Sequence, residues 1–290
     1  PAGKIIRCWL PYPRQDQARQ QDVEFISASE PQYTFSSPEC RHSTLYMEKR
    51  AVEGEPTVFS ETFEFTANGE WHNLKPEDVQ PYDTTTALYK EYTAEREKHI
   101  VFSPRLRELA AKLTAGENNP YLKAKRIFRW VNDNFPWASA REYSTIENIP
   151  EYVLDNRHGD CGQVSLLFIT LCRISGIPAH FQSGFMMHPR AWNLHDWAEV
   201  YFEGVGWVPA DQSFGIPAFA RNADEEYFFL GGIDSWRMIV NTDYGMPLQP
   251  EKQYPRSETV DFQRGEVEWE GGNLYFPQWD YHMDIDYLNY

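Results

Sequence analysis

The 290-residue sequence contains only four cysteines, at positions 8, 40, 161 and 172. Four cysteines are too few for the disulfide framework of a small secreted domain, and no Cys-x-x-Cys pair indicates a structural zinc site. We therefore expect neither a metal nor another cofactor. Cys8 and Cys40 could form one disulfide in an exported protein, or each could be a small buried apolar residue.

Long apolar runs and positive charge are also scarce. No stretch of about 18 apolar residues occurs, so we expect no membrane span. The chain has 27 Lys and Arg against 43 Asp and Glu, a net charge of -16. This balance argues against nucleic acid or an anionic membrane as the main partner. The chain begins Pro-Ala-Gly, and if an export signal was removed we expect a periplasmic or extracellular protein. The oligomeric state stays open.

The first 95 residues have the pattern of antiparallel β-structure. Short β-branched or aromatic runs, separated by turn-forming residues, cover 4–11, 22–29, 44–50 and 57–66. The stretch 68–100 is polar and resembles a linker with one short helix. We predict a β-sandwich-like module with a linker over residues 1–95.

From residue 103 the apolar pattern becomes helical and later returns to strands. The predicted helices cover 104–116, 120–135, 150–154 and 161–175. The predicted strands cover 179–187, 195–202 and 207–211, with weaker signals at 236–240, 258–263, 266–270 and 273–276. Segregated helices and strands after a β module predict an α+β protein, with a second domain at 96–290 that includes the C-terminal strands.

The helix that starts after Asp160 combines several features of a reactive site. Asp160 is a preferred N-cap, and Gln163 completes a capping-box pattern. Cys161 falls in the first turn, where free amides and the helix dipole favour a thiolate. Cys172 lies on the apolar face, so we expect it in the core. Cys161 is the candidate nucleophile, and an inert buried thiol is the alternative.

A cysteine nucleophile needs a base and a group that orients the base. His195 and Asp211 follow in the predicted strands. A three-residue turn at 203–205 would place Asp211 opposite Trp197 and diagonal to His195, on the same face and about 7–8 Å away at the backbone. A two-residue turn would send Asp211 to the other face. The hypothesis therefore predicts an odd turn length or a bulge.

Two segments, GDCGQVSLLFITLCRISGIPAHF and HDWAEVYFEGVGWVPAD, resemble the core of the transglutaminase-like superfamily of cysteine acyl-transfer enzymes. The resemblance covers residues 100–215. It implies a papain-like core, in which a helix bundle carrying the cysteine helix packs on an antiparallel sheet. It also implies that Cys161 is the nucleophile, His195 the base and Asp211 the orienting carboxylate. The N-terminal region is similar to β modules that precede this core in some bacterial members.

Such a site also needs donors for the oxyanion. The backbone amide of Cys161 is the first candidate. Animal transglutaminases use an upstream Trp, and by this resemblance Trp137 is a second candidate, with the Gln163 amide as a competitor. Trp197 shares the strand face of His195, where it either lines the cleft or simply packs.

These features predict acyl transfer through a thioester on Cys161. The first expectation is hydrolysis of a peptide or amide bond, with cell-wall peptides among the substrates considered. The first alternative is a protein-crosslinking transglutaminase that uses an amine acceptor. The second is a non-catalytic peptide- or glycan-binding module on the same fold. A catalytic Cys161 should react with iodoacetamide faster than the other three thiols.

Overall fold

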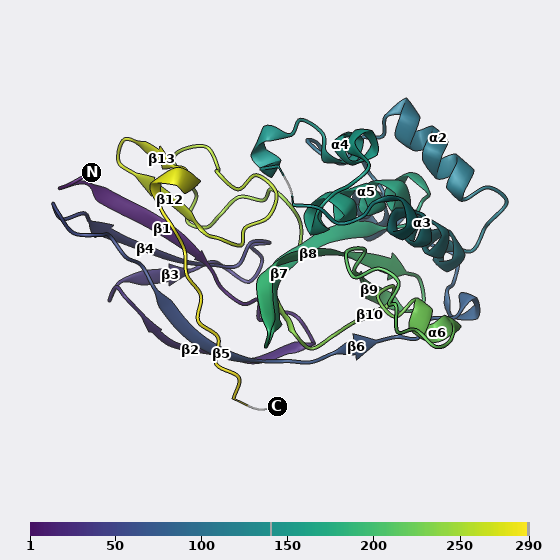
Figure 1. The fold of residues 1–290 in the computed structure, drawn as a ribbon, viewed down its shortest axis with the longest axis horizontal. Helices are drawn as coiled ribbons and strands as arrows, with labels where there is room; N and C mark the ends of the chain where they lie inside the picture. The colour runs from purple at the N-terminus through teal and green to yellow at the C-terminus, as the bar shows by residue number, and fades with distance from the viewer. Residues whose placement is uncertain (140, 289–290) are drawn as a thin grey trace. The chain divides into compact units, whose positions relative to one another are not determined.

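The structure is a computed structural model that describes residues 1–139 and 141–288. It combines helices with antiparallel sheets, which confirms the predicted α+β class (Figure 1). The chain forms two compact units. Unit 1 contains Pro1–Asn68, Ser183–Leu194 and the chain from Trp236 onwards, and unit 2 contains Gly69–Gln182 and His195–Ser235. No helix in the described residues is long and apolar enough to cross a membrane.

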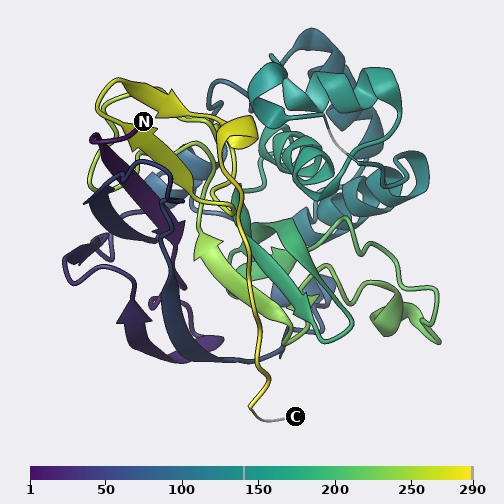
Figure 2. The same cartoon turned by 60° about the vertical axis from the view of Figure 1, so that its left-hand side comes forward.

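Unit 1 is built on a five-stranded antiparallel sheet with the order β13-β12-β1-β4-β3. Its strands are β1 (Ile5–Pro11), β3 (Tyr33–Phe35), β4 (Thr44–Arg50), β12 (Glu266–Trp269) and β13 (Gly272–Leu274). A separate ribbon pairs β2 (Gln20–Ala28) with β5 (Glu61–Ala67). Strands from both ends of the chain therefore meet in one sheet, where purple and yellow ribbons lie side by side (Figure 2).

The C-terminal strands differ from the predicted arrangement. They were expected in a domain 96–290, whereas β12 pairs with β1 in unit 1. The strand predicted at 258–263 is wrong, because this segment has no strand. Its Glu258 carboxylate accepts a hydrogen bond from the backbone N–H of Gln263 at 2.8 Å. The backbone N–H of Gln263 is thus bonded within the segment and is not paired with a neighbouring β-strand. The short 3-10 helix η3 (Phe276–Gln278) follows β13.

The core of unit 1 explains why these strands associate. Six buried apolar side chains form one cluster: Trp9, Phe185, Met238, Val240, Leu248 and Phe262. The strand β11 (Arg237–Asn241) brings Met238 and Val240 into it and pairs with the second half of β7, Ile239 opposite Gly184. Cys8 is buried and Cys40 is partly exposed, and both thiols are free. The disulfide considered from the sequence is therefore not formed.

The four long helices of unit 2 begin and end close to the predicted positions, whereas the helix at 223–226 and both 3-10 helices were not predicted. The helices of unit 2 are α1 (Ala87–Tyr92), α2 (Pro104–Leu113), α3 (Pro120–Asn134), α4 (Ile149–Asn156), α5 (Cys161–Ile174) and α6 (Ala223–Glu226), with the 3-10 helices η1 (Pro76–Asp78) and η2 (Tyr143–Thr145). Ser103 and Asn119 cap α2 and α3, each followed by Pro in the first turn. Helices α2, α3 and α4 pack against α5 (Figure 1), and every residue from Gly162 to Arg173 is buried.

The strands of unit 2 carry the candidate base. β7 (Ala179–His188) and β8 (Ala191–Phe202) pass from one unit to the other along the chain, and β9 (Gly206–Ala210) pairs with β8. The sheet order is β11-β7-β8-β9. A two-stranded ribbon, β6 (Glu70–Trp71) with β10 (Gly232–Ile233), completes the unit. Neither β3 nor β6 was predicted, since both are too short to show an alternating pattern.

Candidate active site

The candidate nucleophile lies at the start of α5, as predicted. Asp160 Oδ1 accepts a hydrogen bond from the backbone N–H of Gln163 at 3.1 Å, and Gln163 Oε1 accepts one from the N–H of Asp160 at 3.3 Å. This reciprocal capping box fixes the turn that presents Cys161, whose residue is partly exposed. Cys172 on the same helix is fully buried, in agreement with its predicted place in the core.

Steric contacts favour glycine at the position after the candidate nucleophile. A Cβ atom on Gly162 would collide with the Tyr143 hydroxyl and would lie 2.6 Å from Asp196 Oδ2. The missing side chain therefore allows a tyrosine from η2 and an aspartate from β8 to approach the helix start.

The candidate base and its orienting carboxylate meet through the β8–β9 hairpin. Phe202 pairs with Gly206, which leaves a three-residue turn, and the pairing continues to Ala198 opposite Ala210. One further step places Trp197 opposite Asp211, so the predicted odd turn length is confirmed. His195 Nε2 and Asp211 Oδ2 are 2.8 Å apart.

Asp211 is held rigidly by its own surroundings. It is fully buried, and its second oxygen, Oδ1, accepts hydrogen bonds from the backbone N–H groups of Ser213 and Phe214, each at 3.1 Å. The bond to Oδ2 favours the His195 tautomer with its hydrogen on Nε2, which leaves proton exchange to Nδ1. The next residue, Gln212, accepts a hydrogen bond from Ser165 of α5 at 3.1 Å. The segment that carries Asp211 after β9 is thus directly connected to the cysteine helix.

Two aromatic rings fix the plane of His195. Trp197 stacks on it at 5.9 Å with an interplanar angle of 29°, and Phe214 meets it edge-on at 5.3 Å. The Trp197 indole N–H donates to Gln182 Oε1 at 2.5 Å. Because Trp197 is fully buried, it supports the imidazole from the core and offers no exposed cleft surface.

The two candidate oxyanion donors lie near the helix start in different environments. Trp137 is 59% exposed and forms a bridge with Gly159, two residues before Cys161. Gln163 is 1% exposed, and its Nε2 has no hydrogen-bond partner among the described residues. A buried amide without an acceptor is uncommon, so Gln163 retains a donor at this site.

The electrostatics at the helix start differ from the prediction. Burial, followed by the charges of Asp196 and Asp160, raises the pKa of the Cys161 thiol well above its usual range. The backbone N–H of Asp196 acts in the opposite direction and is outweighed. Burial and these two carboxylates therefore oppose the thiolate that the helix start favours. Burial also raises the pKa of Asp160 to about 6.

Asp196 is the site residue that the sequence did not reveal. Its Oδ2 lies 3.5 Å from Cys161 Sγ, and its side chain is 1% exposed. The Tyr143 hydroxyl donates to Asp160 Oδ1 at 2.6 Å and lies 3.4 Å from Asp196 Oδ2. Strand alternation would place Asp196 on the face opposite His195, and no local pattern links residues 143, 160 and 196. The sequence offered one indication that Asp196 belongs to the site, which is its position next to His195.

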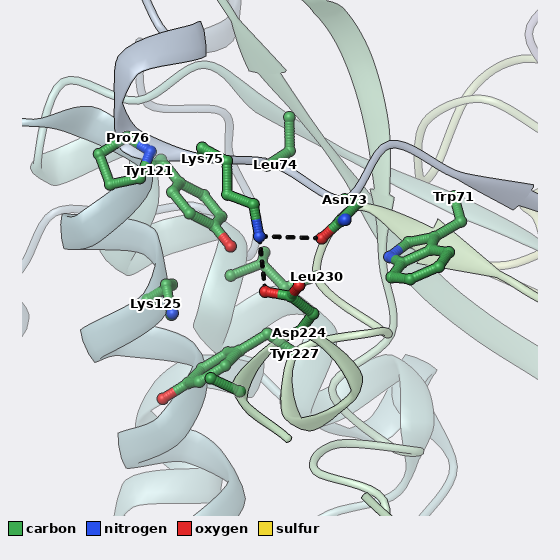
Figure 3. A pocket seen from close by; sticks show the side chains of 11 residues that line it. Trp71, Asn73, Leu74, Lys75, Pro76, Tyr121, Lys125, Asp224, Tyr227 and Leu230 are labelled. Carbon is green, nitrogen blue, oxygen red and sulfur yellow. Dashed lines mark hydrogen bonds and ion pairs between the residues drawn. The ribbon is translucent and has the colours of Figure 1, made fainter. Parts of the chain in front are cut away.

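A separate small pocket lies elsewhere in unit 2 and involves none of these residues. Its volume is about 90 Å³, and Trp71, Tyr121 and Tyr227 contribute to its walls (Figure 3). Lys75 Nζ lies between Asp224 Oδ1, at 2.6 Å, and an Asn73 oxygen, at 3.3 Å. The central cation of this pocket is thus already paired with a carboxylate.

Comparisons with known proteins agree with the core motifs. Residues 107–212 match the model of the Transglutaminase-like superfamily. YebA of Bacillus subtilis (strain 168), described as uncharacterized, is 27% identical over 140 residues, which cover 41% of this chain and 19% of YebA. The chain thus matches about a fifth of the length of this relative.

The fold resembles that of a solved structure. The crystal structure named "Putative Cysteine Protease from Cytophaga hutchinsonii" aligns with a TM-score of 0.57 and 17% identity, covering 83% of this chain and 77% of that chain. The periplasmic domain of TgpA from Pseudomonas aeruginosa gives a TM-score of 0.38 at 14% identity, over 73% and 88% of the two chains. The family model thus covers residues 107–212, which contain the sequence motifs of the resemblance.

Proposed function

We propose that this protein is a cysteine-dependent acyl-transfer enzyme that hydrolyses peptide or amide bonds. Cys161 attacks the carbonyl carbon and releases an amine, and water then resolves the thioester. The observation that carries the proposal is the 2.8 Å contact between His195 Nε2 and Asp211 Oδ2. It supplies an oriented base on a strand that also contacts the Cys161 thiol through Asp196.

Each residue has a distinct role in this mechanism. His195 takes the thiol proton at Nδ1 and passes it to the leaving amine, while Asp211 stabilises the imidazolium that forms. Because the pKa of the thiol is raised, we infer that proton transfer accompanies the attack and that no thiolate is stored beforehand. The backbone amide of Cys161 and the free Nε2 donor of Gln163 are proposed to bind the oxyanion.

A paired assay tests this function. Dipeptide amides, Gln-bearing peptides and cell-wall peptides are incubated with and without a labelled primary amine. Hydrolysis predicts ammonia release or peptide cleavage, and both should be lost to background in Cys161→Ala with unchanged circular dichroism. Cys40→Ala, which removes another partly exposed thiol, is the matched control and should keep full activity.

The same assay separates the alternatives. Incorporation of the amine in preference to water would replace the hydrolase with a transglutaminase. Equal activity of the protein and Cys161→Ala on every substrate would contradict cysteine catalysis. Binding of these peptides without turnover would then support a non-catalytic binding module.

A further inference from the structure

The Cys161 thiol has a hydrogen-bond acceptor that the proposed mechanism does not use. The carboxylate of Asp196 lies 3.5 Å from the sulfur and is shielded from water. A thiol is a weak donor and a carboxylate is a strong acceptor, so the thiol proton is directed to Asp196 in the resting protein. A protonated thiol is a poor nucleophile.

The surrounding groups strengthen this preference. The titratable groups that act on the thiol come from three parts of unit 2: Asp160 from the α5 cap, Asp196 from β8, and Asp211 after β9. All three are carboxylates whose charge opposes a thiolate. The Tyr143 hydroxyl lies within 3.4 Å of two of these, Asp160 and Asp196, and so holds both near the helix start.

We propose that Asp196 is a positioning residue that keeps Cys161 as a hydrogen-bonded thiol until substrate binds. The inference rests on the proposed function only in treating Cys161 as the nucleophile. Its contact geometry depends on Gly162, because any larger residue there would displace Asp196 or Tyr143. Rapid labelling of Cys161, expected from its helix position alone, is therefore not expected in the resting protein.

The test measures how the reactivity of Cys161 depends on pH. The rate of iodoacetamide labelling at Cys161 is followed by peptide mass spectrometry from about pH 6 to pH 10, without substrate. The protein should give a midpoint above the ~8.5 of a free cysteine. In Asp196→Asn the midpoint should fall by about one unit or more, which corresponds to a ~tenfold larger thiolate fraction near neutral pH.

Glu199→Gln is the matched control. It removes a carboxylate from the same strand, but Glu199 bonds Gln182 at 3.0 Å and His180 at 3.1 Å instead of the thiol. Its labelling midpoint should not move. An unchanged midpoint in Asp196→Asn, or an equal fall in Glu199→Gln, would overturn the role of Asp196.

Two further measurements test the role of Asp196 even if Asp196→Asn does not fold or the proposed function is wrong. If Asp196→Asn does not fold, the midpoint of the unmodified protein decides, since a value well below that of a free cysteine contradicts the proposal. Where activity is found, the acidic limb of its pH profile should move down in Asp196→Asn together with the labelling midpoint. Labelling needs no substrate, so an inactive protein with the expected midpoints would contradict only the proposed function.

Discussion

The candidate site has two parts, the β8–β9 hairpin with His195 and Asp211 and the start of α5 with Cys161 and Gln163. Their polar groups are hydrogen-bonded to different degrees. In the β8–β9 hairpin, both oxygens of Asp211 have hydrogen-bond donors and His195 is fixed by two aromatic rings. At the start of α5, the thiol of Cys161 faces a carboxylate and Gln163 keeps an unpaired donor. The candidate base is thus fully hydrogen-bonded to its orienting carboxylate, whereas the candidate nucleophile faces Asp196 and the candidate oxyanion donor of Gln163 has no acceptor among the described residues.

The largest effect on activity should come from a substitution in the β8–β9 hairpin. Asp211→Asn keeps the size of the side chain, but its amide can present a donor to His195 and so favour the wrong tautomer. We expect kcat to fall by about 10⁴-fold, the loss typical of this change in a catalytic triad. Steady-state kinetics measure it, with circular dichroism to show that the fold is kept.

A control substitution in the same hairpin separates the loss of His195 orientation from a general disturbance of the hairpin. Glu203→Ala alters the three-residue turn without touching His195 or Asp211, and its kcat should stay near that of the unmodified protein. If Asp211→Asn retained most of its activity, Asp211 would not orient the base. The proposed roles of both His195 and Asp211 would then need to be abandoned.

A substitution at the start of α5 is expected to have an intermediate effect on kcat. Gln163→Ala removes the buried Nε2 donor, and the loss of one oxyanion donor typically lowers kcat by ~10²–10³-fold. Trp137→Phe removes only an indole N–H from a residue that is 59% exposed, and we expect little change. The ratio of the two kcat values identifies the second oxyanion donor, and the opposite ranking would assign that role to Trp137.

The loss of the cap must be distinguished from the loss of the donor. Gln163 Oε1 also closes the capping box with the backbone N–H of Asp160, so Gln163→Ala should lower the free energy of unfolding by about 0.5–2 kcal/mol. Loss of a donor used only in the transition state lowers kcat without raising KM. A rise in KM with unchanged kcat would therefore contradict an oxyanion role for Gln163.

The same contrast explains what could be predicted from the sequence. The meeting of His195 with Asp211 depends on strand periodicity and on one turn. Gly204 and Gly206, both with positive φ in the structure, mark that turn in the sequence. The capping box of α5 was equally local and was predicted with the right partners.

The surroundings of the thiol could not be predicted in this way. Tyr143 and Asp196 reach Cys161 from positions 18 residues before and 35 residues after it, through packing that no local pattern encodes. The helix start favours a thiolate by itself, but burial and the neighbouring carboxylates outweigh it. For the same reason, the pairing of β12 with β1 was missed, since nothing local links the two ends of the chain.

The last expected effect is on the stability of the protein and concerns the carboxylate of Asp160 at the start of α5. Burial raises the pKa of Asp160 to about 6, whereas an unfolded aspartate titrates near 3.9. Its folded form therefore binds a proton more readily, and its contribution to stability is fully present below about pH 4 and lost as the pH rises through 6. Asp160→Asn keeps a good N-cap and an acceptor for Tyr143 but cannot ionise. Relative to the unmodified protein, it should gain about 2–3 kcal/mol of unfolding free energy between pH 4 and pH 7.

Urea denaturation of both proteins at the two pH values measures this difference. Other titrating groups are common to both proteins, so their contributions cancel in the comparison. Parallel stability profiles would mean that the Asp160 carboxylate ionises in the folded state as easily as in the unfolded state. In that case Asp160 would be a simple helix cap, and the charge that opposes the Cys161 thiolate would have to come from Asp196 and Asp211.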